Sequence, residues 1–475
     1  GLKTLVLERG RAVAHLKDYP TMMMDPWDMA GPNGRLSEAE VNRHYAKQVR
    51  TGYTVTDATK HWWVKDDENP YTETKRFDWI RGYHVGGRSL LWARQSYRLS
   101  PMDFEANARE GVGVDWPIRY EDLAPWYDHA ERFAGVSGRR ENLPQLPDGV
   151  FQPPMEFNAT RTGRMTLQPD AIVTAVLYDA ATGKASGVRI LDAETRDEVE
   201  LYARVIFLCA SALGTTQILL NSTSARFPAG LGNDSDQLGR NCMDHHFMVG
   251  AQADIAGFED RYYVGRRPNG IYIPRFRNLG DAATRRSDFL RGYGYQGGAS
   301  RLGWSRHVAE PGFGAALKEA IDDAGGWTMG ITAFGEMLPH PDNRVTLNRE
   351  VEDVYGLPTL TMDVAIRDNE LAMRKDMQSA AAEMMETAGF KNIRPFDRPY
   401  APGLGIHEMG TARMGRDPKT SVLNGWNQVH ACPNVYVTDG AAMTSSSCVN
   451  PSLTYMAMTA RAADHAVNAL KRGEL

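Results

Sequence analysis

The stretch Val-Ile-Phe-Leu-Cys-Ala-Ser-Ala-Leu-Gly-Thr-Thr-Gln-Ile-Leu-Leu-Asn, from Val205 to Asn221, decides the fold. Val205 to Ala210 is apolar without interruption, which is typical of a strand inside a sheet that is covered on both faces. Ser211 to Asn221 predicts a helix directly after that strand. A buried strand that leads into a helix indicates an α/β architecture.

Two other stretches repeat this pattern near the ends of the chain. Thr4 to Leu7 predicts a buried parallel strand that ends at the acidic residue Glu8. Val435 to Val437 predicts another strand, and Asn450 to Leu470 predicts the last helix, with Pro451 at its first position. The α/β part of the protein therefore draws on both ends of the chain.

Residues 251–400 have a different pattern, in which short β-like runs alternate with loops before a long helix from Asp368 to Ala388. We therefore expect a second domain there, of the α+β class with a mainly antiparallel sheet. It interrupts a discontinuous first domain made of residues 1–250 and 401–475. That first domain should also hold a helix at Tyr120–Phe133 and consecutive strands, which we place at Ala171–Tyr178, Gly187–Leu191 and Val199–Leu208.

Composition excludes several classes of protein. The chain has 475 residues, 42% apolar and 24% charged, which is ordinary for a globular protein of more than one domain. A net charge of −5 argues against nucleic-acid binding, and no apolar run reaches the roughly 18 residues of a membrane span. Cys242 and His245 form one CxxH step without a second ligand pair, so we expect no metal site. We expect structural thiols, not disulfides, at the cysteines Cys209, Cys242, Cys432 and Cys448.

The chain opens almost directly in the strand that begins at Thr4, without a helix or a cap before it. We therefore expect that upstream residues are missing. The compartment, periplasmic or cytoplasmic in a bacterium, stays open for the same reason.

Two glycine-rich motifs are candidates for a phosphate-binding loop. The run from Gly292 to Gly297 matches GxGxxG, but no apolar strand precedes it, so we interpret it as an aromatic strand. Gly86-Gly87-Arg88-Ser89 is a better candidate, because adjacent glycines let backbone N–H groups approach a phosphate. An ordinary turn explains it equally well. Glu8 could accept hydrogen bonds from a ribose or be a solvated strand end, and the glycine loop expected about 20 residues before it is not in this sequence.

The C-terminal quarter holds the strongest local signals. His407 lies in a stretch with glycines at 403, 405, 410 and 415, which suits a tight path beside a ligand, although single histidines are more often structural. Asp439-Gly440 follows a strand, and Asn450 precedes the last helix. A helix N-terminus favours anions, and Asn450 could cap the helix, face a cofactor, or do both.

Taken together, these segments resemble the glucose–methanol–choline (GMC) oxidoreductases, in particular their sugar-oxidising branch. The resemblance follows the family's order along the chain, through LVLERG (from Leu5), HVGGRSLLW (from His84), DWPIRYEDLAPWY (from Asp115), VIFLCASALGTTQILLNS (from Val205), LGRNCMDHH (from Leu238), HEMGTARMG (from His407), VYVTDGAAM (from Val435) and NPSLTYMAMTARA (from Asn450). The GGRSLLW and NPSLT forms are most similar to the glycoside 3-dehydrogenases.

The resemblance implies an FAD-binding, Rossmann-like domain interleaved with the substrate-binding domain. It implies that His407 and Asn450 are the catalytic pair, with His407 as the base and Asn450 orienting a hydroxyl so that a hydride passes to flavin N5. The cofactor contacts that it implies are Glu8, Gly86, Gly87, Ser89, Leu91, Val173, Ala210, Asp439, Gly440, Pro451 and Ser452. The candidate substrate contacts are Gln296, Glu336, Arg94 and Gln95, each of which could equally be an ordinary polar residue.

Three departures from the family pattern affect the flavin site. The first strand with its glycine loop is absent from the sequence, and the chain between Asn158 and Thr160 is short for the family. Leu91 stands where pyranose oxidases carry the histidine that bonds covalently to FAD, which predicts non-covalent FAD here. For the absent glycine loop and the short stretch between Asn158 and Thr160, we favour missing residues over weak FAD binding as the explanation.

The resulting hypothesis is an FAD-dependent dehydrogenase that oxidises a secondary hydroxyl of a sugar or glycoside, with C3 favoured, to a ketone. Dehydrogenases of this branch often work with a small subunit and a cytochrome electron acceptor. The alternatives are an oxidase that uses oxygen, a flavin-free scaffold subunit, and a lyase on the same fold.

Overall fold

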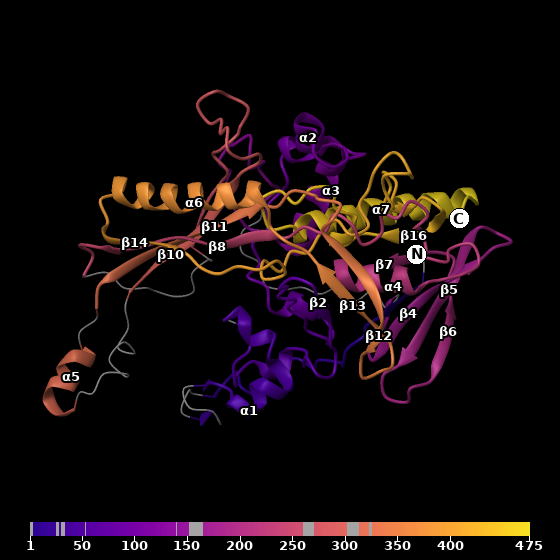
Figure 1. The fold of residues 1–475 in the computed structure, drawn as a ribbon, viewed down its shortest axis with the longest axis horizontal. Coiled ribbons are helices and arrows are strands. Elements are labelled where there is room, and N and C mark those ends of the chain that lie inside the picture. Colours follow the sequence, from indigo (N-terminus) through magenta and orange to yellow (C-terminus); the bar gives the residue numbers. More distant parts are fainter. Residues whose placement is uncertain are drawn as a thin grey trace.

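The computed structural model describes residues 3–24, 28–29, 34–52, 54–138, 140–151, 165–259, 270–301, 313–322 and 325–475. Figure 1 shows two neighbouring parts, one with several small sheets and the helices α3, α4 and α7, and a second with a long sheet under helix α6. The expected combination of an α/β part with an antiparallel part is confirmed. The segment between Asn158 and Thr160 lies outside the described residues.

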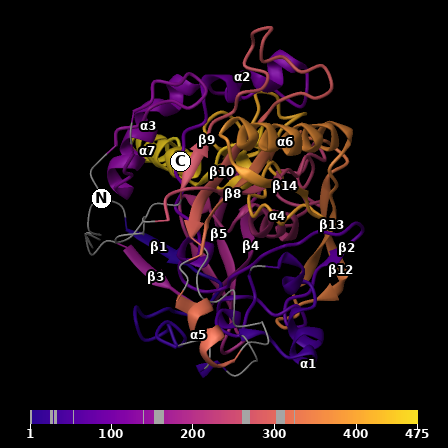
Figure 2. The same ribbon diagram turned by 90° about the vertical axis from the view of Figure 1, so that its left-hand side faces the viewer.

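The α/β part is built around the stretch that decided the fold. Strand β7 (Ile206–Leu208) pairs in parallel with β16 (Cys432–Val437), which also pairs with β15 (Gln428–Val429), and helix α4 (Ala212–Asn221) follows β7. The predicted strand and helix are therefore confirmed, and segments more than 200 residues apart meet in one sheet. The expected position inside the sheet is wrong, because β7 is the edge strand in the order β15-β16-β7 of the described residues. Helix α7 (Ser452–Arg472) packs against α3 (Tyr120–Ala134), as both views show (Figures 1 and 2).

Strand β1 (Thr4–Leu7) is parallel, as expected, but its predicted burial is wrong. It pairs with β3 (Met165–Gln168) in a two-stranded sheet, and 45% of Leu5 and 36% of Val6 are exposed. A parallel strand is normally covered on both faces. Here one partner strand leaves the apolar side chains of β1 open.

The predicted hairpin is confirmed as β4 (Ala171–Asp179) and β5 (Lys184–Asp192), joined by β6 (Glu198–Tyr202) in one antiparallel sheet. The single strand expected from Val199 to Leu208 is wrong, because the chain leaves this sheet after Tyr202 and enters another at β7. Gly187 lets β5 and β6 approach each other, since a Cβ there would lie 2.1 Å from the Leu201 carbonyl oxygen.

The second part is a five-stranded antiparallel sheet in the order β14-β8-β11-β10-β9. Its strands are β8 (His245–Ile255), β9 (Ile271–Ile273), β10 (Tyr293–Arg301), β11 (Trp327–Glu336) and β14 (Lys391–Asp397). Helix α6 (Asp368–Thr387), close to its predicted bounds, lies along one face (Figure 1). Met373 and Met377 of α6 pack there on Val249 and Ala333 of the sheet. The Gly292–Gly297 run enters β10, so its interpretation as a strand is confirmed.

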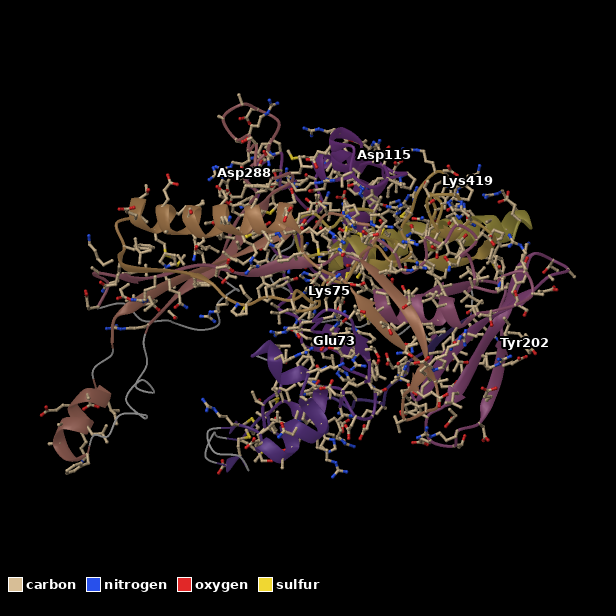
Figure 3. The ribbon with its side chains drawn as sticks, viewed as in Figure 1. Glu73, Lys75, Asp115, Tyr202, Asp288 and Lys419 are labelled. Atoms are coloured by element: carbon tan, nitrogen blue, oxygen red, sulfur yellow. The ribbon has the colours of Figure 1, made fainter. Side chains whose placement is uncertain are left out.

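A small sheet connects the two parts. Strand β12 (Arg344–Glu352) pairs with β13 (Pro358–Asp363), which pairs on its other side with β2 (Thr72–Glu73) from the N-terminal part of the chain. Lys75 bonds Asp363 at 2.6 Å beside this junction, where Figure 3 labels Glu73 and Lys75 next to β13. The shorter helices are α1 (Glu38–Glu40), α2 (Pro101–Glu110) and α5 (Gly314–Asp322).

Two details of the predicted helices are wrong. Phe133, expected on the buried face of α3, is 87% exposed in the last turn, beyond the end of the packed face. The last helix begins at Ser452, so Pro451 is its N-cap, and Asn450 precedes the cap instead of forming it. The amide of Asn450 bonds Gln296 across the interface between the two parts.

Candidate active site

Asp244, at the start of β8, shapes the turn that carries His407. Its buried carboxylate accepts backbone N–H groups from Gly403 (2.8 Å), Gly405 (2.9 Å), His407 (3.1 Å) and His245 (2.8 Å). Burial and nearby Glu408 raise the pKa of Asp244 to about 7, whereas the N–H donors lower it. Because four backbone donors point at it, we assign the ionised form.

Glycine is required in this turn for a steric reason. A Cβ at Gly405 would lie 2.2 Å from the His245 carbonyl oxygen and 2.4 Å from Asp244 Oδ1. The glycine-rich stretch singled out in the sequence therefore brings the chain close to β8, and His407 follows directly after it.

Half-buried His407 contacts the buried histidine His245. Its Nδ1 lies 2.9 Å from Nδ1 of His245, and the two rings are inclined by 76° with centroids 4.8 Å apart. His245 Nε2 lies 3.3 Å from the carbonyl oxygen of Ser446. Burial lowers the pKa of His407 well below its ordinary value, and His245 and Arg88 lower it further. Neutral His407 can therefore accept a proton at physiological pH.

Asn450 is held from the antiparallel sheet. Gln296 of β10 donates from Nε2 to Asn450 Oδ1 at 2.8 Å. With its oxygen bonded in this way, the amide of Asn450 has its N–H groups left to donate. Asn450 also lies four residues after Ser446, whose carbonyl oxygen contacts His245. The segment 446–450 therefore carries Asn450 and also contacts the histidine that bonds His407.

A buried ion pair connects the expected cofactor loop to the His407 segment. Arg88 donates to both carboxylate oxygens of Glu408, at 3.1 and 2.7 Å. Arg88 belongs to the turn in which Gly86 and Gly87 have left-handed φ of 90° and 45°. Of the two side chains, 27% of Arg88 and 1% of Glu408 are exposed.

Asp439 joins the same network from the other side. Its Oδ2 accepts the Thr215 hydroxyl of α4 at 2.5 Å, and Gly410 N donates to Gly440 O at 3.0 Å. Burial raises the pKa of Asp439 to about 6, and the bond from Thr215 lowers it. The HEMGT and TDG motifs of the sequence are therefore neighbours.

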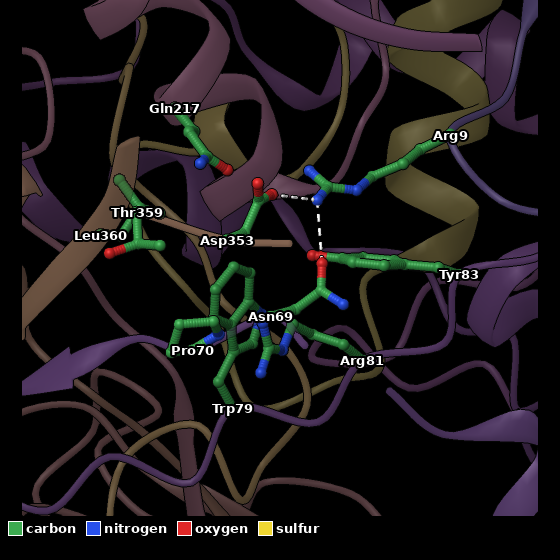
Figure 4. Close-up of a pocket in the computed structure, with 10 residues that line it drawn as sticks. All are labelled: Arg9, Asn69, Pro70, Trp79, Arg81, Tyr83, Gln217, Asp353, Thr359 and Leu360. Carbon is green, nitrogen blue, oxygen red and sulfur yellow. Dashed lines mark hydrogen bonds and ion pairs between the residues drawn. The ribbon is translucent and has the colours of Figure 1, made fainter. Parts of the chain in front are cut away.

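The end of β1 lies beside the start of β4. Ala171 N donates to Glu8 O at 2.9 Å, which places Val173 of β4 nearby, and the Glu8 carboxylate accepts Gly10 N at 2.9 Å. Burial raises the pKa of Glu8. The neighbouring Arg9 turns away and bonds Asn69 and Asp353 in a separate small cavity (Figure 4).

The residues present fit the adenosine and flavin portions of FAD. Cys209 and Ala210 at the end of β7 are exposed by area, yet burial raises the pKa of the Cys209 thiol to about 11. Leu90 and Leu91 also leave 40% and 36% of their areas open. Exposed apolar side chains after a glycine turn, together with the carboxylates of Glu8 after β1 and Asp439 after β16, suit a dinucleotide.

The other candidate substrate residues are Glu336, Arg94 and Gln95, of which Glu336 pairs with His245 in the register of β11 and β8. Glu336 is 1% exposed, with Arg275 and Arg291 at 3.9 and 3.7 Å, and burial raises its pKa to about 7. It is thus enclosed in a charged cluster. Arg94 is exposed with φ 61°, and Gln95 is half-buried. The roles assigned to the site residues, Pro451 and Ser452 at the start of α7 included, stay predictions.

Sequence reasoning assigned no role to Asp244, His245, Arg88 or Glu408. The only available signal was their position inside motifs already quoted, Asp244 and His245 in LGRNCMDHH and Glu408 beside His407. Among the described residues, no cluster of three or more His, Cys, Asp or Glu side chains is arranged to hold a metal ion. In the same ranges no helix is both long and apolar enough to cross a membrane.

Known proteins match the chain in both of its parts. Residues 155–247 match the N-terminal family model of GMC oxidoreductases, and residues 339–459 match the C-terminal one. A 2-methyl-1,2-propanediol dehydrogenase from Mycolicibacterium austroafricanum is 27% identical over 88% of this chain and 92% of its own length. The fructose dehydrogenase large subunit from Gluconobacter japonicus is 28% identical over 82% and 81%. The crystal structure of pyridoxine 4-oxidase from Mesorbium loti superimposes with a TM-score of 0.57 at 16% identity, over 97% and 94% of the two chains.

The matches and the two-part fold define an FAD-dependent oxidoreductase that acts on CH–OH groups. The chain belongs to the GMC oxidoreductase family.

Proposed function

We propose that the protein oxidises a secondary hydroxyl of a sugar or glycoside, with C3 favoured, to a ketone. The proposal rests chiefly on half-buried His407, whose pKa is lowered well below its ordinary value and which is neutral at physiological pH. The sugar class is supported by the similarity to a fructose dehydrogenase, and C3 by the GGRSLLW and NPSLT forms of the sequence.

Oxidation of CH–OH to C=O removes a proton from oxygen and a hydride from carbon. FAD, when bound, accepts the hydride and carries the redox change. His407 takes the hydroxyl proton, a task typically worth about 10²–10⁴-fold in rate. Asn450, with its amide oxygen bonded to Gln296, donates N–H to the substrate oxygen and fixes its orientation. Gln296 thus acts through Asn450 in this proposal and not as a substrate contact.

The test is anaerobic stopped-flow reduction of the flavin by methyl β-D-glucoside and by its 3-deoxy analogue. We expect the flavin absorbance to bleach with the glucoside and not with the analogue, and His407→Ala to slow bleaching by about 10²-fold or more. Equal bleaching by both sugars would overturn C3 but keep a sugar as the substrate. No bleaching by any sugar, with FAD bound, would overturn the substrate class.

Two alternatives have their own readouts. In an oxidase, oxygenated buffer would reoxidise the reduced flavin rapidly. In a dehydrogenase, reoxidation by oxygen would be slow and a different electron acceptor would be needed. The name of the G. japonicus relative, a large subunit, supports a partner subunit, to which we add a cytochrome acceptor. A protein that shows no flavin absorbance after addition of FAD would be the scaffold subunit instead.

A further inference from the structure

His245 is a buried ionisable side chain to which the proposed function gives no task. It opens β8, is 1% exposed, and lies between the carbonyl oxygen of Ser446 and the ring of His407. Both of its ring nitrogens therefore face a polar partner inside the protein.

The two partners fix where the protons lie. A carbonyl oxygen can only accept, so Nε2 of His245 carries a hydrogen toward Ser446 O, 3.3 Å away. In a neutral imidazole the other ring nitrogen then carries a lone pair and no hydrogen, so Nδ1 of His245 is a hydrogen-bond acceptor. The bond of 2.9 Å to His407 consequently takes its hydrogen from Nδ1 of His407.

The opposite arrangement is unfavourable. If His245 donated to His407 from Nδ1, a neutral ring would turn an unprotonated Nε2 toward the Ser446 carbonyl oxygen. A doubly protonated ring would avoid that repulsion, but burial disfavours the cation and lowers the pKa of His245 to about 4.

We propose that His245 is a positioning residue, which holds His407 as the tautomer with hydrogen on Nδ1 and so leaves Nε2 free to take the substrate proton. This inference rests on the proposed function, since it explains how His407 is kept ready as a base. It extends to the transferred proton. When His407 gains a hydrogen on Nε2, its Nδ1–H still donates to neutral His245, so no other hydrogen bond has to rearrange.

Replacements of His245 can test the hydrogen bonds of its two ring nitrogens separately. In His245→Asn the side-chain oxygen can take the place of Nδ1 and still accept from His407. In His245→Gln the amide reaches the place of Nε2 and can donate to Ser446, but it leaves His407 without its acceptor. His245→Leu removes both bonds. His246→Leu is the matched control, because His246 is equally buried and packs against Gly335 of β11.

Flavin reduction in the holoenzyme variants is the first readout. We expect His245→Asn to stay within a few-fold of the wild type, and His245→Gln and His245→Leu to lose about tenfold or more, up to the 10²–10⁴-fold of losing the base. KM should change little, because His245 does not contact the substrate in this proposal. Equal rates in the Asn and Gln variants, or equal losses in His245→Leu and His246→Leu, would overturn the proposal.

The second readout does not depend on activity. Histidine labelled with ¹⁵N in the holoenzyme reports, through long-range ¹H–¹⁵N spectra at pH 7, which ring nitrogen carries hydrogen, and the spectrum of His407→Asn identifies the signals of His407. We expect Nδ1–H in the wild type and in His245→Asn, and a mixture of tautomers in His245→Leu. Hydrogen on Nε2 of His407 in the wild type would overturn the inference. A wild-type rate in His407→Ala would overturn the proposed function instead.

Discussion

Removing the Arg88 side chain should cost far more stability than its partial exposure suggests. The guanidinium makes two bonds, of 3.1 and 2.7 Å, to the Glu408 carboxylate, which is 1% exposed. Arg88→Met leaves that carboxylate buried without a partner. Breaking a buried pair from one side typically costs about 3–5 kcal/mol, whereas removing both charges is often nearly neutral. We therefore expect about 3–5 kcal/mol for Arg88→Met, and clearly less for Arg88→Met combined with Glu408→Met.

Urea unfolding followed by far-ultraviolet circular dichroism measures this cycle. FAD is kept at one saturating concentration, because bound ligand adds its own stabilisation. Arg94→Met is the matched control, an exposed arginine of the same segment, and should stay within about 0.5 kcal/mol of the wild type. The reasoning fails if Arg88→Met costs less than about 1 kcal/mol, or if the double variant costs the sum of the single ones.

Three further outcomes follow from the site. Because the pKa of His407 lies well below its ordinary value, flavin reduction should stay at its full rate as pH falls through 6.5 and decline only at lower pH; a decline centred at 6.5 would contradict this. Gln296→Leu should reduce kcat about tenfold with little change in KM, since it frees the amide of Asn450 to turn, and kinetics with unchanged kcat would oppose it. Burial lowers the pKa of His246 to about 3, so the unfolded chain binds a proton below pH 6.5 that the folded one does not. Unfolding free energy should fall by about 2 kcal/mol from this group between pH 6.5 and 5, and urea midpoints of His246→Leu should depend less on pH.

Elements with strong periodicity were predictable from the sequence. The long helix from Asp368 was placed within a residue of its observed end. The glycines around His407 predicted a tight path beside a ligand; the structure shows a close approach of Gly405 to His245, and the ligand stays a prediction. In these cases the physical cause is local. Apolar spacing selects the helix, and the absence of a Cβ permits the close approach.

Properties that depend on neighbours far away in the chain were not predictable. The apolar run from Val205 specifies a strand, but nothing within Thr4–Leu7 reveals that β1 has one partner and an open face. Asn450 fits a helix cap by its sequence, yet Gln296, 154 residues away, takes its amide oxygen. His245 was considered only as half of a metal motif, because its true partner lies 162 residues later.

In these distant contacts one part of the protein carries the expected catalytic side chains, and the other part carries the groups that bond them. Both expected catalytic side chains, His407 and Asn450, belong to the C-terminal segment of the α/β part. The groups that hold them, His245 on β8 and Gln296 on β10, belong to the antiparallel sheet. Cofactor segments and catalytic groups can therefore be disturbed separately. A cavity under α6, as in Met377→Ala, should shift β8 and β10 and lower the rate of flavin reduction while the affinity for FAD stays near that of the wild type. Equal losses in FAD affinity and rate would show that the sheet supports the whole site and not the orientation of its two catalytic side chains.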